Sequence, residues 1–84
     1  MVTISLYYWA GARAAAGVES ERFDADTVAE ALAAARVSRA DPRFDRVLGA
    51  SSLLVDGLAV HADDLARPRA EDTRVEVLPP FAGG

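Results

Sequence analysis

The chain contains no cysteine and no lysine, and His61 is its only histidine. Without cysteine, the chain cannot form disulfide bonds, zinc–thiolate sites, iron–sulfur clusters or a thiol nucleophile. A Ser–His–Asp triad would have to use His61, and no Gly-x-Ser-x-Gly motif accompanies it. The sequence therefore lacks the usual centres of redox and nucleophilic catalysis.

All nine basic residues are arginine, and alanine is abundant. A GC-rich genome would account for both biases. A second interpretation is chemical, because a chain whose C-terminal carboxylate becomes activated should carry few competing amines. Without lysine, only the α-amino group remains to attack that carboxylate in cis. Composition does not distinguish these two interpretations.

Charge and hydropathy limit the possible partners. The net charge of −4 argues against nucleic acid or an anionic membrane and favours attraction to a basic surface. No apolar run approaches the ~20 residues that span a bilayer, and the N-terminus lacks the charged and apolar regions of a signal peptide. We therefore expect a cytoplasmic protein.

The beginning of the chain predicts a hairpin. Residues 2–9 alternate between apolar and polar side chains, which is typical of a strand. The side chains on its core-facing side are Val2, Ile4, Leu6 and Tyr8. The small residues 10–17 are expected to turn the chain, so that residues 18–24 pair back as a second strand.

Two helices are expected next. Thr27 and Glu30 fit a capping box that begins the main helix. Its buried stripe recurs at helical spacing and consists of Val28, Ala31, Leu32 and Ala35. Asp41 followed by Pro42 fits the N-cap and first position of a short second helix, and Gly49 is expected to end it.

The remainder of the domain predicts a second hairpin and a last strand. Asp56-Gly57 suits a type I′ turn, whose two central residues need positive φ, between residues 52–55 and 58–61. Leu65 is expected to fill the core from a loop, and residues 73–78 alternate as a strand. This order of elements predicts an α+β fold, with one main helix across a mixed sheet and a short second helix. The first and last strands would be central parallel neighbours, as in a β-grasp, or ubiquitin-like, domain, which we place at residues 1–78.

Residues 79–84 form an uncharged tail. Pro79 and Pro80 would stiffen its exit from the domain. One aromatic anchor and then ever smaller side chains follow, as Phe81, Ala82, Gly83 and Gly84. At ~3.3 Å per residue the tail reaches about 20 Å. A flexible tail of this kind suits threading into a narrow active site, where a Cβ would not fit; the alternative is a frayed chain end.

Residues 6–13 (Leu-Tyr-Tyr-Trp-Ala-Gly-Ala-Arg), Asp56-Gly57 and residues 75–84 together resemble the small subunit of molybdopterin synthase. That family belongs to the ubiquitin-like sulfur carriers of molybdopterin and thiamine synthesis. The resemblance extends over essentially the whole chain, and its most specific part is the Pro-Pro-x-Ala-Gly-Gly ending.

The resemblance implies a function in molybdenum cofactor biosynthesis. An activating enzyme would consume ATP to adenylate the carboxylate of Gly84, and a sulfur donor would convert it to a thiocarboxylate. The tail would then enter the large synthase subunit and give its sulfur to a pterin precursor. The chain itself would bind no cofactor, would not be catalytic alone and would act within a hetero-oligomer.

A partner surface is expected beside the tail. Trp9, Ala59 and Leu78 fall on the outward side of their strands and would form an exposed apolar patch. The alternative is that the chain's own loops cover Trp9. Arg13 would pair with a carboxylate of a partner or of this chain.

The remaining charged residues indicate no further site. The arginines of the helical region are interpreted as solvating; they are Arg36, Arg39, Arg43 and Arg46. The acidic pairs Asp63-Asp64 and Glu71-Asp72 are interpreted as solvated turns, with basic loops of a partner as the alternative. They lack further ligands at a recognisable spacing, so no metal site is predicted.

Three other functions remain open. A sulfur carrier for thiamine or cysteine biosynthesis would use the same C-terminal chemistry. A ubiquitin-like protein modifier would instead join Gly84 to lysines of target proteins. A non-covalent interaction module would not need a terminal diglycine at all.

Overall fold

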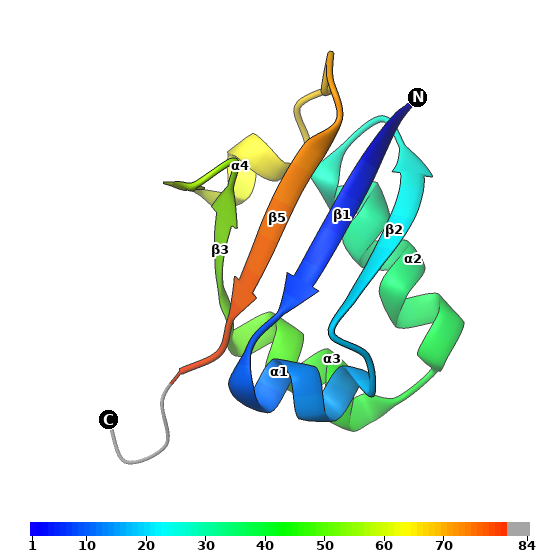
Figure 1. Cartoon of the computed structure of the whole chain (residues 1–84), viewed down its shortest axis with the longest axis vertical. Coiled ribbons are helices and arrows are strands. Elements are labelled where there is room, and N and C mark those ends of the chain that lie inside the picture. Colours follow the sequence, from blue (N-terminus) through cyan, green and yellow to red (C-terminus); the bar gives the residue numbers. More distant parts are fainter. Residues whose placement is uncertain (81–84) are drawn as a thin grey trace.

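The computed structural model describes residues 1–80, so the predictions for Phe81, Ala82, Gly83 and Gly84 lie outside the described residues. The strands within that range are β1 (Val2–Tyr8), β2 (Ser20–Ala25), β3 (Ser52–Val55), β4 (Leu58–Ala59) and β5 (Thr73–Leu78). The helices are α1 (Ala10–Ala16), α2 (Val28–Arg39), α3 (Pro42–Ala50) and α4 (Ala62–Leu65) (Figure 1).

The strands form one mixed sheet in the order β2-β1-β5-β3-β4. β1 and β5 are parallel neighbours with Tyr8 opposite Val77, and the other pairings are antiparallel. α2 lies across one face of the sheet, while α1 and α3 lie together at the end where β1 and β5 finish (Figure 1). The predicted α+β, β-grasp fold is confirmed.

The core lies between the sheet and the helices. Ile4, Leu6, Val75 and Val77 of the two central strands are fully buried there, as predicted, whereas Val2 is only partly buried. The predicted stripe of α2 is also buried, and α3 adds Phe44 and Leu48. Burial of these apolar side chains supplies the main driving force for folding.

Local signals fix several element ends. The Thr27 hydroxyl accepts a hydrogen bond from the Glu30 amide (3.0 Å) and begins α2. Asp41 Oδ1 accepts one from the Arg43 amide (2.9 Å) and begins α3. The φ angles of Asp56 and Gly57 are 48° and 84°, so both central residues of that hairpin turn have the positive φ that a type I′ turn needs.

Residues 10–17 were predicted to be a turn, and this prediction is wrong: they include a helix, α1, whose C-cap is Gly17 with φ 79°. Its alanines favour a helix by propensity, and Ala12 is buried. α1 packs against α3. Small residues can supply such a helix because they allow close approach of its backbone.

Several bounds also differ from prediction. Gly49 lies inside α3, which continues to Ala50. β2 begins at Ser20 and β4 ends at Ala59. Leu65, which was expected in a loop, is the last residue of a one-turn helix, α4. Leu65 itself packs partly buried against the core, as predicted.

Candidate functional site

The tail leaves the domain from the end of β5, beside the end of β1. The Trp9 amide donates a hydrogen bond to the Val77 carbonyl (3.2 Å). Because β1 and β5 are parallel, their ends lie at the same end of the sheet (Figure 1). Trp9 and Leu78 therefore occupy neighbouring strand ends next to Pro79, where the tail begins.

Trp9 is held there by the fold. Its neighbour Tyr8 points into the core and is 2% exposed, whereas Trp9 follows the last residue of β1, is the N-cap of α1 and is 48% exposed. About half of the surface of Trp9 is thus left uncovered by residues 1–80. An exposed tryptophan is a frequent anchor in protein interfaces.

Ala59 lies apart from the other two residues of the predicted patch. It is opposite Leu54 of β3, which is in turn opposite Glu76 of β5. Ala59 is exposed and Leu78 half-buried, but β3 separates them, and Leu78 faces Ser52. The structure therefore brings Trp9 and Leu78 together and leaves Ala59 at the edge of the sheet.

An apolar hollow next to the first tail residues was missed from the sequence. It has a volume of about 260 Å³ and is lined by Gly11, Arg46, Val47, Ala50, Pro79 and Pro80. It forms only because α1 and α3 meet at the end of β5, so no local pattern indicated it. We use the name tail-exit surface for Trp9, Leu78 and this hollow.

Arg13 pairs with a carboxylate of its own chain. Its Nη2 lies 3.5 Å from Glu19 Oε2, and both side chains are more than half exposed. Exposed pairs of this kind contribute about 0–1 kcal/mol to stability. Arg13 was predicted to pair with a carboxylate either of a partner protein or of its own chain, and the structure shows the pair within the chain.

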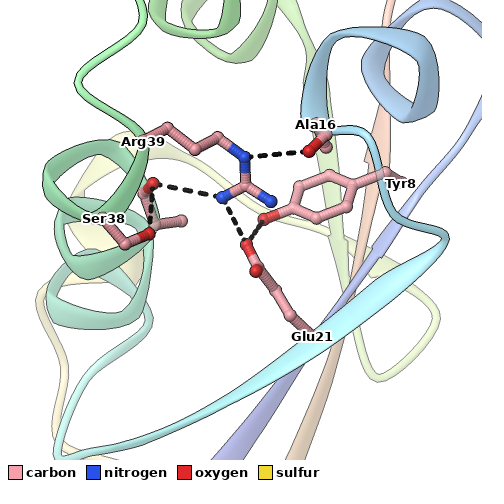
Figure 2. Close-up of polar contacts among 6 residues, drawn as sticks. Tyr8, Ala16, Glu21, Ser38 and Arg39 are labelled. Carbon is pink, nitrogen blue, oxygen red and sulfur yellow. Dashed lines mark hydrogen bonds and ion pairs between the residues drawn. The ribbon is translucent and has the colours of Figure 1, made fainter.

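Arg39 is not a solvating residue, and that interpretation is wrong. Figure 2 shows its guanidinium enclosed between β2, α1 and α2. Nη1 lies 2.6 Å from Glu21 Oε1, and the same oxygen accepts the Tyr8 hydroxyl at 2.6 Å. Nε donates to the Ala16 carbonyl (3.1 Å) and Nη1 to the Ala35 carbonyl (3.1 Å).

This arrangement, which we call the Arg39 cluster, joins five elements, β1, α1, β2, α2 and α3. The guanidinium also stands 4.3 Å from the ring centroid of Phe44 in α3, and that ring meets Tyr8 edge-on at 5.7 Å. The side chains of Arg39 and Glu21 are only 14% and 23% exposed. The cluster thereby holds α1, and with it Trp9, against the sheet.

The protonation states in the cluster follow from this geometry. Burial raises the pKa of the Tyr8 hydroxyl, and its hydrogen bond to the Glu21 carboxylate raises it further. The hydrogen bond that the Arg39 guanidinium donates to the Glu21 carboxylate raises the pKa of the guanidinium. Tyr8 therefore stays neutral and Arg39 charged at physiological pH.

The sheet face opposite the helices carries both aromatic and charged side chains. Arg74 lies 3.8 Å from the ring centroid of Tyr7 and 3.7 Å from Glu76. At the other end of β5, Asp56 accepts hydrogen bonds from the Arg69 side chain and the Arg74 amide, both at 2.9 Å. These contacts fix the hairpin of β3 and β4 to β5.

No group of three or more metal-binding side chains occurs among residues 1–80. The helices found in that part of the chain are also too short or too polar to cross a membrane. The predictions of a cytoplasmic location and of no bound cofactor stay predictions.

The whole domain is similar to solved structures of small archaeal modifier proteins. The protein SAMP1 from Haloferax volcanii is 27% identical, with a TM-score of 0.74, and the match covers 98% of this chain and 99% of that one. Small archaeal modifier protein 1 from Methanosarcina acetivorans is 20% identical, with a TM-score of 0.80 and coverage of 100% and 98%.

A second similarity is to a two-subunit factor. The chain matches a structure of the complex of subunits 1 and 2 of molybdopterin-converting factor from Helicobacter pylori, at 16% identity, with a TM-score of 0.68 and coverage of 98% and 99%. No protein-family model matches the chain, and no curated protein sequence is significantly similar to it. The structural neighbours agree with the predicted resemblance to the ubiquitin-like sulfur carriers.

Proposed function

We propose that this protein is a sulfur carrier whose Gly84 carboxylate is adenylated and then converted to a thiocarboxylate. The observation that carries the proposal is the Pro-Pro-Phe-Ala-Gly-Gly sequence directly after the central strand β5 of a β-grasp domain. The tail-exit surface supplies a docking area next to it. Solved structures of the same fold include a converting-factor subunit and protein modifiers.

The residues suit this chemistry. A free carboxylate is a poor electrophile, whereas an acyl adenylate carries a good leaving group. Glycine at position 84 leaves the carbonyl open to attack because it has no side chain. No titratable side chain follows Glu76, so acid and base groups must come from partner proteins. The chain would therefore act as a macromolecular cosubstrate.

We further propose that the sulfur is used for molybdopterin, with this chain as the small subunit of the synthase. The complex of subunits 1 and 2 from Helicobacter pylori supports a large-subunit partner. On this proposal Pro79, Pro80, Phe81, Ala82 and Gly83 thread the active site, and Trp9 and Leu78 pack against the partner. An adenylating enzyme and a sulfur donor would complete the set of partners.

A second candidate function is protein modification. The similarity to two small archaeal modifier proteins specifically favours it. Both functions begin with activation of Gly84, and they differ in the acceptor. A modifier forms an amide with a target lysine, whereas a carrier gives up sulfur and returns with a free carboxylate.

The decisive experiment is intact mass spectrometry of the chain purified from its native cells. We expect a species heavier by the replacement of one oxygen by sulfur, mapped to Gly84. A chain extended by one residue after Gly84 is the matched control and should remain unmodified. Full conversion of the extended chain would contradict the proposal.

Products isolated from the same cells also distinguish the two candidate functions. Peptides in which a lysine carries the C-terminal residues of this chain would identify a modifier. Conversion of a cyclic pterin precursor by the thiocarboxylated chain with its large subunit would identify the synthase. Absence of both, together with an unmodified mass, would leave only a non-covalent interaction module.

A further inference from the structure

We propose that two copies of this chain associate through the edge strand β2, which pairs antiparallel with its own copy about a two-fold axis at Phe23. This interaction surface is separate from the proposed function and does not depend on it. Figure 1 shows β2 at the edge of the sheet beside β1. The opposite edge is β4, which has two residues, whereas β2 has six. Of these two edges, only β2 is long enough to pair with another strand.

One side of β2 carries backbone groups that have no neighbouring strand. The Tyr8 amide donates a hydrogen bond to the Glu19 carbonyl (2.9 Å), so alternate residues from Glu19 onward bond to β1. The residues between them are Ser20, Arg22 and Asp24, whose N–H and C=O groups point away from β1. All three residues are exposed. Within residues 1–80 no strand lies on that side, so a second strand can bond there.

The charges on β2 select how a second copy pairs. In an antiparallel pair of identical strands, the residue on the two-fold axis lies opposite its own copy. An axis at Glu21, Arg22 or Asp24 would place two like charges directly opposite each other, which is destabilising. An axis at Phe23 instead places Arg22 of each copy opposite Asp24 of the other. This register forms two pairs of opposite charges, and the outward backbone groups of the same residues face each other.

Arg22 and Asp24 are available for these contacts. They lie opposite Ser5 and Thr3 of β1, and neither forms an ion pair among residues 1–80. The Asp24 carboxylate accepts a long hydrogen bond from the Thr3 hydroxyl (3.4 Å). Charged residues on an edge strand usually prevent pairing. Here their order around Phe23 opposes pairing with most strands and permits pairing with a second copy.

The helix-side face of β2 also accommodates a second copy. Phe23 packs partly buried against the core, and the two Phe23 rings would be neighbours across the axis. Glu21 would lie opposite Ala25, whose small side chain leaves the ion pair between Glu21 and Arg39 (2.6 Å) undisturbed. Because the contact involves one strand and its ion pairs are exposed to solvent, we expect a weak dimer.

The first test is the mass of the full chain in solution, measured by sedimentation equilibrium. We expect the mass to rise towards that of two chains between ~10 µM and ~1 mM, as for a Kd on the order of 100 µM. Arg22→Asp and Asp24→Arg each place like charges opposite each other at two positions, so each should weaken self-association about 30-fold. Arg67→Asp is the matched control, because Arg67 is exposed and lies near β4 at the other edge. Its self-association should stay close to that of the wild type.

A mixture of the two variants tests the register. When Arg22→Asp meets Asp24→Arg, two acidic residues of one copy face two arginines of the other. The mixture should therefore form a heterodimer at least as tight as the wild-type dimer. A mixture that stays monomeric would overturn the inference, as would a wild-type chain that is monomeric at ~1 mM.

A single introduced thiol locates the axis, because the chain contains no cysteine. Phe23→Cys places two thiols opposite each other within reach of a disulfide bond. Diamide takes up one hydrogen atom from each thiol and is reduced to its hydrazine, while the S–S bond forms. We expect a covalent dimer of Phe23→Cys. Ser20→Cys is the control, since its two thiols would lie about 20 Å apart; equal cross-linking of both variants would contradict the proposed register.

Discussion

Tyr8 and Trp9 are adjacent in the sequence, yet their side chains have opposite surroundings. Tyr8 is 2% exposed and belongs to the Arg39 cluster, whereas Trp9 is 48% exposed and belongs to the tail-exit surface. One residue of a strand separates an inward from an outward side chain. The cluster stabilises the fold, and we propose that the tail-exit surface binds partners.

The largest effect on stability is expected from Phe44→Ala. The Phe44 ring is 1% exposed and contacts both Tyr8 and Arg39, so its removal leaves a cavity under the cluster. We expect a loss of about 3–5 kcal/mol in the free energy of unfolding, measured by urea denaturation. A loss below ~1 kcal/mol would mean that the cluster does not depend on this ring.

A smaller effect is expected from Arg39→Met, which leaves the Glu21 carboxylate without its guanidinium. Breaking a fully buried pair costs about 3–5 kcal/mol, and the partial exposure here should reduce the loss to about 2 kcal/mol. Arg13→Met is the control, because the exposed pair with Glu19 should contribute less than ~1 kcal/mol. If both variants lost the same free energy of unfolding, the Arg39 cluster would stabilise the fold no more than an exposed ion pair does.

Alkaline pH should destabilise the fold through Tyr8. Because the pKa of its hydroxyl is raised in the folded chain, that chain keeps a proton which the unfolded chain loses above pH ~10. This contribution is fully present below pH ~10 and is lost as the pH rises towards the folded pKa, by up to about 1.4 kcal/mol per pH unit. Urea unfolding at several pH values measures the slope, and Tyr8→Phe should reduce it. An unchanged slope in that variant would assign the effect to other groups.

The smallest effect on stability is expected from Trp9→Ala, below ~1 kcal/mol, because half of the side chain is already in contact with solvent. Binding to a large-subunit partner should nevertheless weaken by about 30-fold or more, as for an interface anchor. Calorimetry with that partner measures the change. Ala59→Ser provides a control at a position that lies apart from the tail-exit surface. Unchanged affinity of Trp9→Ala would remove Trp9 from the proposed interface.

Much of the fold was predictable because its signals are local. The alternation of residues 2–9 and 73–78, the Thr27 and Asp41 caps and the Asp56-Gly57 turn each act through neighbouring residues. Helix α1 was missed because a run of small residues is compatible with both a turn and a helix. Its packing against α3, which lies far along the chain, selects the helix.

The candidate site was predictable only in part. The alternation of inward and outward side chains placed Trp9 and Leu78 on the outer face of the sheet. The parallel pairing of β1 and β5 brings the two residues together. The alternation of a strand shows which face of the sheet a residue is on, but not which strands lie next to each other. It therefore did not reveal that β3 separates Ala59 from Trp9 and Leu78. The hollow lined by Pro79 and Pro80 depends on the meeting of α1 and α3, which no sequence period encodes.

The sequence by itself determined the strands, the main helix and the hairpin turn, since these depend on residue type and short-range spacing. Only the tertiary structure decided that Arg39 turns inward to Glu21 and Tyr8. The physical reason is that a charged side chain is buried only where distant segments supply its partners. Those segments meet only after the sheet and helices have packed.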